Sequence, residues 1–368
     1  MKNRKIIINT NEGRYPILIG KNISFSLGSI LNQNSILPSK ILFVIDVKVP
    51  KKIVVKILKS IKKKYQIFYF NSSEKNKSQK SIYKIIDILL KNNFNRNDCL
   101  ISIGGGITGD TAGYAASIYK RGMIYINIPS TLLAQVDASI GGKTGINSKY
   151  GKNLIGTFYQ PKLVITDTIF LKSLPEREIL CGYGEIFKHS IIFDKKFFLY
   201  LDKHIEKILN LKTPYIESSI LKSCIIKKKI VEKDFKERNL RKALNLGHTF
   251  GHAYEAYLGY SKKLNHGEAV ILGIASATKF SYLKKILNFK NYKLILDHIS
   301  KINKNLFLKK YFNIKSKNKI IKYMANDKKN FDKNINLVLI NKIGEVNFKN
   351  KYTISEIDKF LRVQLKSI

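Results

Sequence analysis

The first half of the chain alternates short apolar segments with segments of helical spacing, and this alternation limits the fold more than any other feature. Strands separated by helices form a mostly parallel sheet with helices on both faces. We therefore expect an α/β domain in this half. The expected strands are 5–9, 15–19, 41–45, 66–70, 99–103, 124–128 and 163–165, and the expected helices include 54–63 and 81–91.

The pattern changes near Leu174-Pro175. From there to about residue 287 almost every segment is compatible with a helix, and the later sequence offers one strand candidate, 336–340. We predict two domains, an α/β domain over 1–173 and a mainly α-helical domain over 174–368.

Composition supports two globular domains and excludes several classes of protein. The chain has 368 residues, of which 44% are hydrophobic, enough to build cores. No apolar run is long enough to span a bilayer. The three cysteines are scattered, which argues against a disulfide framework or a cysteine zinc site. The apolar stretch after the basic N-terminus is too short for a signal peptide, so we expect a cytoplasmic protein.

The formal net charge of +41 raises the possibility of nucleic-acid binding. The excess is mostly lysine, it accompanies abundant isoleucine and asparagine, and it is spread along the chain. A general drift in composition would produce the same charge, and no nucleic-acid-binding signature accompanies it. We expect no nucleic-acid partner, although an anionic substrate would be attracted by this charge.

Four polar side chains recur at helical spacing in the second half. A guanidinium, an amide and two imidazoles are separated by 4, 3 and 4 positions: Arg241, Asn245, His248 and His252. On a helix this spacing places them on one stripe, and each requires a partner when buried. The stripe indicates a functional site, and a surface helix with scattered polar residues is the alternative. Gly247 and Gly251 would allow another segment to pack close to this helix.

Carboxylate and imidazole groups in this half could form a metal site. Catalytic zinc sites use sets such as two histidines and one glutamate, with positions left open. Glu185, His248 and His266 make such a set, and the pair His248 and His252 could also bind a metal through one helix face. Glu185 shares its expected helix with Lys188, and that helix face could instead be solvated.

Glycine-rich segments mark places where an anion could approach the backbone. Gly104, Gly106 and Gly109 follow an expected strand and fit the pattern G-x-G-x-x-G, which is typical of phosphate binding. The acid expected about 20 residues later is absent. Asp46, at the end of an earlier strand, could hold a ribose instead, and a tight turn without a ligand is the alternative. Further polar residues among glycines could bind phosphate or carboxylate: Asp137, Lys143, Lys152 and Asn153.

A series of motifs, in order and spacing, resembles the 3-dehydroquinate synthase family over most of the chain. The motifs are GGGITGD at 104–110, KRG at 120–122, PSTLLAQVD at 129–137, GGKTG at 141–145, GKNLIG at 151–156, GEIFKH at 184–189, RKALNLGHTFGH at 241–252, HGEAV at 266–270 and DKK at 327–329.

The resemblance implies a dehydroquinate synthase-like fold with a Rossmann-like N-terminal domain. It implies a lyase of the shikimate pathway that converts 3-deoxy-D-arabino-heptulosonate 7-phosphate to 3-dehydroquinate and phosphate, a step toward aromatic amino acids. The family uses NAD for a transient oxidation, followed by phosphate elimination, reduction and an intramolecular aldol step. One divalent metal, zinc or cobalt, and a homodimer are also implied, with no membrane partner.

Carried over residue by residue, the resemblance implies three sets of site residues. The metal ligands would be Glu185, His248 and His266. The substrate site would contain Asp137, Lys143, Lys152, Asn153, Lys188, Lys227, Arg241, Asn245, His252 and Lys328, with Arg121 reaching the substrate phosphate of a neighbouring subunit. The NAD site would contain Asp46, Ser72, Ser73, Glu74, Lys75, Asn76, Lys77, Gly106, Ile107, Thr108, Gly109, Asp110, Ser130, Thr131, Lys143, Lys152, Phe170, Leu171, Lys172, Ser173, Leu174 and Glu178.

One departure from the family pattern bears on NAD affinity. The family has Asp-Gly before the glutamate that precedes the adenine-contacting lysine, and this chain has Ser72-Ser73. Two other enzyme classes share the implied NAD and metal chemistry. Another sugar-phosphate cyclase would act on a substrate without a carboxylate, which Lys227 and Arg241 disfavour. A metal-dependent polyol dehydrogenase would release NADH.

Overall fold

The computed structural model describes residues 4–261, 263–325 and 334–366, which divide into two compact units. The first unit contains Met1–Ile179 and Ile216–Phe235, and the second contains Leu180–Tyr215 and Lys236–Ile368. The sequence analysis placed a single boundary near residue 173. The structure instead groups most of helix α7 (Tyr215–Lys233) with the first unit. On α7, the thiol of Cys224 donates a hydrogen bond to the carbonyl oxygen of Gln135 at 3.5 Å.

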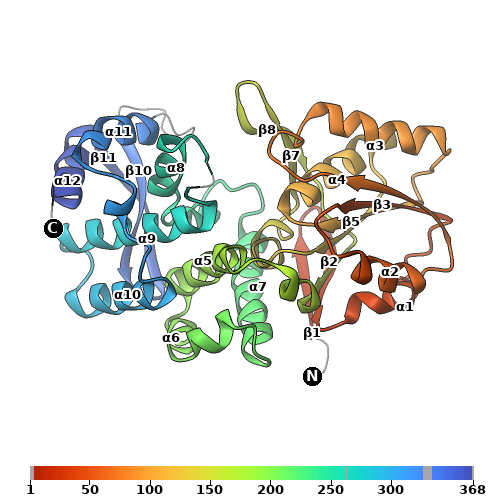
Figure 1. Ribbon diagram of the computed structural model, residues 1–368, viewed down its shortest axis with the longest axis horizontal. Helices are drawn as coiled ribbons and strands as arrows, with labels where there is room; N and C mark the ends of the chain where they lie inside the picture. Colours follow the sequence, from red (N-terminus) through yellow and green to blue (C-terminus); the bar gives the residue numbers. More distant parts are fainter. Residues whose placement is uncertain (1–3, 262, 326–333, 367–368) are drawn as a thin grey trace. The chain divides into compact units, whose positions relative to one another are not determined.

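A seven-stranded sheet forms the centre of the first unit, with the order β1-β2-β9-β6-β5-β3-β4 (Figure 1). Neighbouring strands are parallel except for the antiparallel pair β1 and β2, which confirms the expected sheet. The elements of this unit besides α7 are β1 Arg4–Thr10, β2 Gly13–Gly20, α1 Leu27–Gln33, β3 Lys40–Asp46, α2 Lys51–Lys59, β4 Lys64–Phe70, α3 Gln79–Lys91, β5 Cys99–Gly104, α4 Gly106–Ile118, β6 Ile124–Pro129, β7 Lys143–Ser148, β8 Gly151–Phe158 and β9 Leu163–Asp167.

Strand β3 shows why helices cover both faces of this sheet. Its side chains alternate between the two faces, as the two-residue period of a strand requires. Phe43 belongs to one hydrophobic core together with Leu31 of α1 and Ile57 of α2. Val44 belongs to the other core together with Ile85 of α3 and further residues of α4. A strand buried on both faces is continuously apolar, which is why the sequence revealed it.

The order in which successive strands are added to the sheet reverses between β3 and β5. Strand β3 is followed by β4 on one side, whereas β5 is followed by β6 on the other. In open α/β sheets a ligand binds at such a switch point, outside the carboxyl ends of the strands. Asp46 ends β3 and Gly104 ends β5, so the fold brings the two predicted nucleotide-binding segments to one edge of the sheet.

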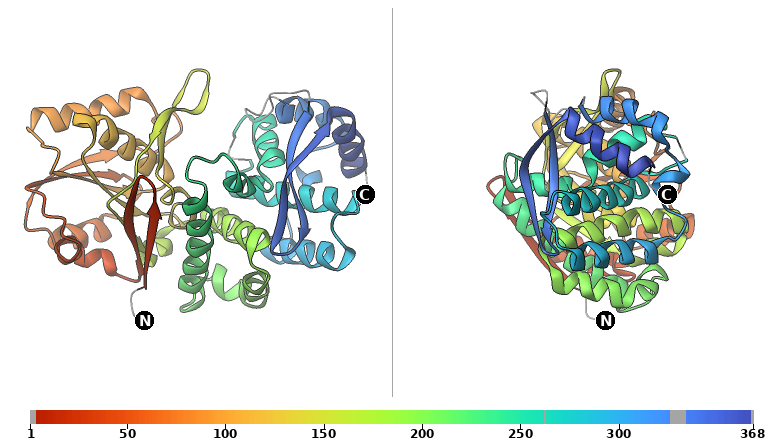
Figure 2. Two further views of the ribbon diagram at one scale, coloured as in Figure 1. Left: turned by 180° about the vertical axis from the view of Figure 1, so that it is seen from behind. Right: turned by 90° about the vertical axis from the view of Figure 1, so that its left-hand side faces the viewer.

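The hairpin of β7 and β8 was not predicted from the sequence. Its strands pair antiparallel and extend away from the main sheet of the first unit (Figures 1 and 2). Residues 153–158 of β8 are all exposed. A strand without a buried face lacks the alternation of apolar and polar residues by which strands are recognised, so the glycines of this segment suggested a loop.

The second unit is mainly helical, as expected, and also contains an antiparallel pair of strands that lies beside α9 (Figure 2). The predicted strand 336–340 lies within β10. The sequence analysis missed β11, whose side chains alternate between exposed and half-buried positions. The elements are α5 Glu176–Phe193, α6 Lys195–Leu209, α8 His248–Tyr257, α9 His266–Leu283, α10 Phe289–Ile302, α11 Lys317–Ala325, β10 Asn334–Lys342, β11 Glu345–Thr353 and α12 Ile354–Lys366.

Helices α8 and α9 pack backbone against backbone. A Cβ atom at Gly251 would lie 2.9 Å from the carbonyl oxygen of Ala269, and one at Gly273 would lie 2.0 Å from that of Gly247. This contact confirms the close packing expected of the glycines in this segment. None of the helices in the described part of the chain combines the length and apolar character that crossing a membrane requires.

Candidate functional site

The predicted helical stripe from Arg241 to His252 is not one helix. Arg241 and Asn245 lie in a 3₁₀ helix, Leu240–Asn245, and α8 begins only at His248. Gly247 between them has φ +79°, a left-handed conformation that a continuous α-helix does not contain. The expectation of a single helix was therefore wrong.

Three helices of the second unit bring the predicted metal ligands together. His248 is the first residue of α8, His266 is the first residue of α9, and Glu185 lies within α5. Asn265 caps α9: its side chain accepts a hydrogen bond from Glu268 N–H at 2.9 Å, and the Glu268 carboxylate accepts one from Asn265 N–H. This capping box fixes the turn that carries His266.

The two histidines and Glu185 have the composition and spacing of a metal site. One donor atom from each lies within 4.8 Å of the others. His248 Nε2 is 3.7 Å from Glu185 Oε1, a separation that two ligands of one ion can have. A histidine binds a metal through a ring nitrogen of its neutral imidazole.

The environment of Glu185 tests whether a cation fits this cluster. The side chain is 1% exposed, and neither carboxylate oxygen accepts a hydrogen bond of normal geometry from the described residues. Lys188, one turn later on α5, forms an ion pair with it and is also buried. A buried carboxylate requires a compensating charge, and its oxygens together with two imidazoles match the donors that zinc prefers. The residues present therefore fit a divalent metal.

Both imidazoles of this cluster are oriented through Nδ1. His248 Nδ1 lies 3.3 Å from the carbonyl oxygen of Leu246, and His266 Nδ1 lies 3.0 Å from Glu255 Oε2. Burial lowers the pKa of His266, but the hydrogen bond and charge of Glu255 outweigh this effect and raise the pKa above its usual value. The sequence analysis missed Glu255, although its position seven residues after His248 puts both on one face of α8.

Two further substrate-site candidates of the second unit, His252 and Asn245, have side-chain partners in the structure. His252 stacks on His266 with ring centroids 5.9 Å apart, and His252, Glu255 and His266 form a second group that could hold a metal. Asn245 donates to Glu237 Oε1 at 3.3 Å. The sequence analysis also missed Glu237, which precedes the motif of the stripe. Lys328 lies outside the described residues.

The substrate candidates of the first unit form ion pairs with one another and with NAD candidates. Lys227, on α7, donates to Asp137 Oδ1 and to the Asp137 carbonyl at 2.5 Å. Lys77 donates to Asp110 Oδ2 and to Asn153 Oδ1, also at 2.5 Å. Burial raises the pKa of Asp110, and the ammonium of Lys77 opposes that shift. The lysines predicted to bind an anion thus have carboxylate partners here.

Glu74 joins the loop at 71–78 to the β7–β8 hairpin. Its carboxylate accepts hydrogen bonds from Lys152 at 3.0 Å and from Asn147 at 2.7 Å. Burial alone would raise the pKa of Glu74, but these two partners hold it below its usual value. The structure therefore places Glu74 and Lys77, predicted for NAD, beside Lys152 and Asn153, predicted mainly for the substrate.

The glycine-rich turn after β5 packs closely against two neighbouring segments of the first unit. A Cβ atom at Gly105 would lie 3.1 Å from Thr131 Cγ2, and one at Gly106 would lie 3.2 Å from Ala138 Cβ. Ser130 N–H donates to the Gly104 carbonyl at 2.8 Å, so the predicted segments around 106–110 and 130–131 are adjacent.

Other NAD candidates differ in exposure. Phe170 and Leu171 are buried in the core of the first unit. The exposed candidates are Lys75, Lys172, Ser173 and Glu178. Ser72, whose carbonyl accepts a hydrogen bond from Lys48, is buried, and Asp46 Oδ1 accepts one from Lys48 N–H. Both loops thus contain buried and exposed candidates, and their roles stay predictions.

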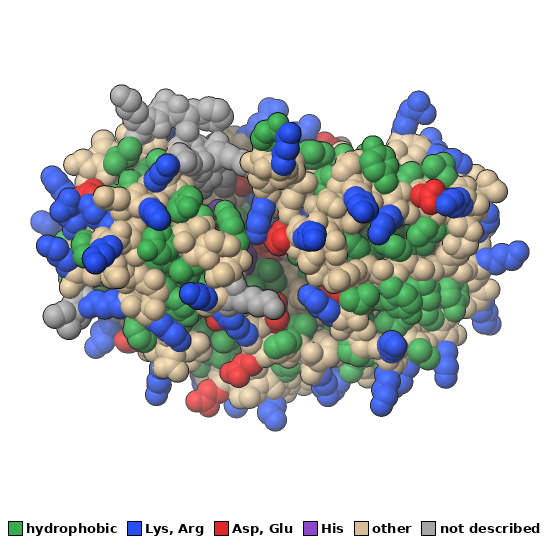
Figure 3. All heavy atoms as spheres, turned by 45° about the horizontal axis from the view of Figure 1, so that its top comes forward, with side chains coloured by type: hydrophobic (Ala, Val, Ile, Leu, Met, Phe, Trp, Pro, Cys, Tyr) green, Lys and Arg blue, Asp and Glu red, His purple; other side chains and the backbone are tan. Residues whose placement is uncertain are grey.

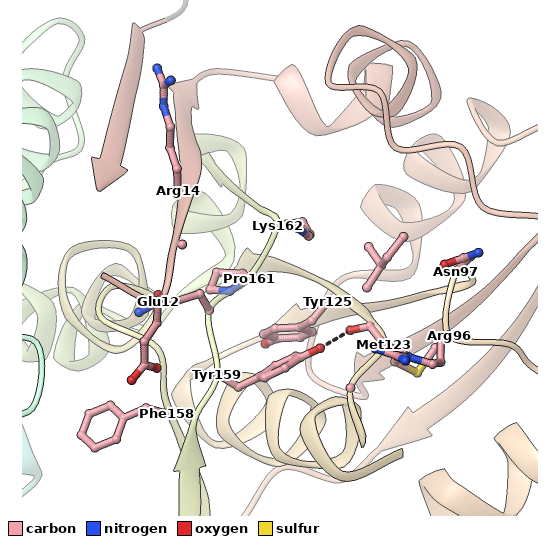
Figure 4. Close-up of a pocket in the computed structure, with 14 residues that line it drawn as sticks. Glu12, Arg14, Arg96, Asn97, Met123, Tyr125, Phe158, Tyr159, Pro161 and Lys162 are labelled. Atoms are coloured by element: carbon pink, nitrogen blue, oxygen red, sulfur yellow. Dashed lines mark hydrogen bonds between the residues drawn. The ribbon is translucent and has the colours of Figure 1, made fainter. Parts of the chain in front are cut away.

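A cavity of about 760 Å³ lies on the first unit, and its lining contains none of the predicted NAD residues but includes the start of β6 and the segment after β8 (Figure 4). Its lining includes Arg96, Tyr125 and Tyr159, and Tyr159 donates to the Met123 carbonyl at 2.6 Å. Arg121, predicted to reach a neighbouring subunit, is exposed next to Gly122 of this lining and has φ +61°.

Comparisons with known proteins identify the family. The models for the N-terminal and C-terminal parts of 3-dehydroquinate synthase match residues 67–181 and 182–330. A 3-dehydroquinate synthase of Pelagibacter ubique is 56% identical over 362 residues, covering 98% of each chain. The chain belongs to the 3-dehydroquinate synthase family. A member from Buchnera aphidicola is 40% identical over 93% of this chain and 92% of its own length.

Solved structures share the fold of this family member at lower identity. A 2-deoxy-scyllo-inosose synthase complexed with carbaglucose-6-phosphate, NAD⁺ and Co²⁺ has a TM-score of 0.86 and 23% identity, covering 98% of this chain and all of its own. A 2-epi-5-epi-valiolone synthase from Streptomyces hygroscopicus with NAD⁺ and Zn²⁺ has a TM-score of 0.85 and 22% identity, covering 97% and 98% of the two chains. Both confirm the predicted dehydroquinate synthase-like fold.

The large positive charge is spread widely on the one face of the described residues that Figure 3 draws. Lys and Arg side chains are scattered over both units on the face shown in Figure 3. A nucleic-acid-binding surface gathers them into a patch or stripe. On this face they form no single patch or stripe, and the absence of a nucleic-acid partner stays a prediction.

Proposed function

We propose that this chain acts as a 3-dehydroquinate synthase, converting 3-deoxy-D-arabino-heptulosonate 7-phosphate to 3-dehydroquinate and phosphate. The observation that carries the proposal is the buried carboxylate of Glu185 facing His248 and His266 in a chain of this family. The same proposal places the enzyme in the cytoplasm, where the shikimate pathway would use it.

Glu185, His248 and His266 would hold a zinc or cobalt ion. The bound ion would polarise substrate hydroxyl oxygens and so lower the cost of developing negative charge on them. The chain's own contribution is to fix the donors: helix starts set both imidazoles, and α5 sets the carboxylate. Lys188 is buried beside Glu185, and its ammonium group would donate to a substrate hydroxyl.

The other basic residues would orient the substrate. We assign Lys152, Asn153 and Arg121 in the first unit, and His252 in the second, to the substrate phosphate. Lys227 and Arg241 would bind the carboxylate. Asp137 and Asn245 would orient hydroxyl groups, and Lys143 and Lys328 would add positive charge for the anionic substrate. Fixing these groups in advance lowers the barrier by positioning rather than by a dedicated protein base.

NAD would bind at the switch point of the first unit. Bound NAD would accept a hydride from the substrate and return it within one turnover. Asp46 would accept hydrogen bonds from a ribose, the turn at 104–106 would lie against the pyrophosphate, and Glu74 and Lys77 would lie toward the adenine end. Because Lys77 is already bound to Asp110 and Asn153, its contacts must change when NAD and substrate arrive.

A homodimer is part of the proposal. The β7–β8 hairpin exposes apolar side chains at Tyr150, Leu154, Ile155 and Phe158, with relative exposures from 38% to 80%. Exposed apolar groups gathered on one element indicate a contact surface. Arg121 would then extend into the substrate site of the partner. Sedimentation of the chain at several concentrations tests the dimer separately from the activity.

The test of the function is phosphate release from the heptulosonate phosphate. We expect release that requires NAD, is lost after exhaustive chelation and returns with Zn²⁺ or Co²⁺, without net accumulation of NADH. Stoichiometric NADH formation would favour a polyol dehydrogenase instead. Turnover of a sugar phosphate that lacks a carboxylate, in preference to the heptulosonate, would indicate another cyclase.

A further inference from the structure

Glu255 lies behind one of the three candidate metal ligands. It is on α8, two turns after His248, and its Oε2 lies 3.0 Å from Nδ1 of His266 on α9. The Glu255 side chain is 12% exposed and that of His266 is 35% exposed. The pair is therefore largely shielded from water, where a charged hydrogen bond is stronger than on an open surface.

The packing of the two helices fixes this contact. Gly251 and Gly273 bring the backbones of α8 and α9 into direct contact, so the two helices have little freedom to slide. The capping box of Asn265 and Glu268 fixes the first turn of α9, which carries His266. A carboxylate held by one helix thus meets an imidazole held by the other.

A histidine binds a metal through one ring nitrogen, and a hydrogen bond at the other nitrogen sets its tautomer and direction. His248 receives this support from a backbone carbonyl, that of Leu246. His266 receives it from the side chain of Glu255, with Nδ1–H donating to the carboxylate. The tautomer stabilised in this way leaves Nε2 of His266 with its lone pair.

We propose that Glu255 is a positioning residue that holds His266 in the tautomer and direction needed to bind the metal through Nε2. The inference rests on the proposed metal site of Glu185, His248 and His266. Because His252, Glu255 and His266 are also close enough to hold an ion, the competing role for Glu255 is that of a direct ligand to a second metal.

The test compares three variants of the full chain, freed of metal and titrated with Zn²⁺ against a chromophoric chelator. Glu255→Ala removes the acceptor, and we expect its Zn²⁺ affinity to fall about 10- to 100-fold. Glu255→Gln keeps a carbonyl oxygen at the same place, so most of the affinity should be restored. Glu206→Gln, an exposed carboxylate on α6 of the same unit, is the matched control and should bind as the wild type.

A measurement on the unaltered chain keeps the inference testable if Glu255→Ala does not fold. Long-range ¹⁵N NMR of the Zn²⁺-loaded protein should show His266 protonated at Nδ1 and bound to the metal through Nε2. Metal on Nδ1 of His266, unchanged affinity in Glu255→Ala, or two ions per wild-type chain and one per Glu255→Gln chain would each overturn the proposal. Failure of the underlying site is distinguishable, because the wild-type chain itself would then not bind Zn²⁺.

Discussion

The buried carboxylate of the second unit and the carboxylates of the first unit differ in their surroundings. In the second unit Glu185 is almost wholly buried, yet its oxygens accept no hydrogen bond of normal geometry from the described residues. In the first unit the carboxylates of Asp110 and Asp137 accept short hydrogen bonds from Lys77 and Lys227. Glu185 is paired with the Lys188 ammonium and also faces two imidazoles, whereas Asp110 and Asp137 are each hydrogen-bonded to a lysine.

This difference in the partners of the carboxylates indicates how each unit would bind its ligand. Buried polar groups are normally satisfied, and the Glu185 carboxylate, paired with Lys188 but without a hydrogen bond of regular geometry, faces two imidazoles with which it could share a cation. A lysine that is already paired must exchange its partner before it can bind an anionic ligand. We therefore expect the second unit to bind the metal, and the first to exchange contacts between its own carboxylates and the anions of NAD and substrate.

The largest expected effect is the loss of a metal ligand. His248→Ala removes one of three donors, and the metal's share of the reaction is several kcal/mol, so we expect turnover to fall by about 1,000-fold or more. Phosphate release with saturating NAD measures this loss. Circular dichroism should show an intact fold. Normal turnover that stays sensitive to chelation would place the metal elsewhere.

Lys227→Met tests the paired cluster of the first unit. It removes a charged donor to the substrate carboxylate, and we expect kcat/KM to fall about 10- to 100-fold. Asp137 also loses its cation, so the free energy of unfolding should fall as well. Lys227→Met combined with Asp137→Asn should recover stability without recovering activity. Recovery of both would mean that Lys227 serves the fold and not the substrate.

The next effect is expected at a buried histidine of the second unit whose two ring nitrogens both have hydrogen-bond partners. His298 is buried, with Nδ1 2.9 Å from Asp202 Oδ1 and Nε2 2.9 Å from the Tyr183 hydroxyl. His298→Leu leaves the buried Tyr183 hydroxyl without this partner and loses the stacking on Phe187, so we expect a loss of about 2–4 kcal/mol in unfolding free energy. Chemical denaturation at neutral pH measures it.

The pH dependence of that loss follows from two pKa values. Burial lowers the pKa of His298 below 6.5, and the hydrogen bond from His298 lowers the pKa of Asp202 from 3.8 to about 2. Both shifts stabilise the fold above the unfolded pKa values and cease to do so as the pH falls through the folded ones. The difference between wild type and His298→Leu should therefore be largest above about pH 6.5 and narrow on acidification. A difference that widens in acid would show a protonated His298 in the native state.

The smallest effect is expected at the hairpin contact of the first unit. Glu74 and Lys152 have side chains 52% and 39% exposed, and exposed pairs contribute about 0–1 kcal/mol. Glu74→Gln should change the free energy of unfolding by no more than about 1 kcal/mol. Because the fold would then be almost unchanged, calorimetric titration of Glu74→Gln with NAD would measure the effect of the substitution on NAD affinity alone. A larger loss of stability would show that the hairpin depends on this contact.

The sequence predicted the parallel sheet because strands such as β3 are apolar on both faces. It predicted neither β8, whose residues 153–158 are exposed, nor the break at Gly247, because a left-handed glycine leaves the helical spacing of its neighbours unchanged. Glu185 entered the metal set through its donor chemistry and the resemblance, since sequence spacing does not connect α5 to α8. Glu255 was missed because its partner lies on another helix.

The most direct test is the anomalous scattering of a Zn²⁺-loaded crystal recorded at the zinc edge. The account predicts a single strong peak about 2.0–2.2 Å from one oxygen of Glu185 and one ring nitrogen each of His248 and His266. A peak bound instead by His252, Glu255 and His266, or zinc bound without Glu185, would contradict it.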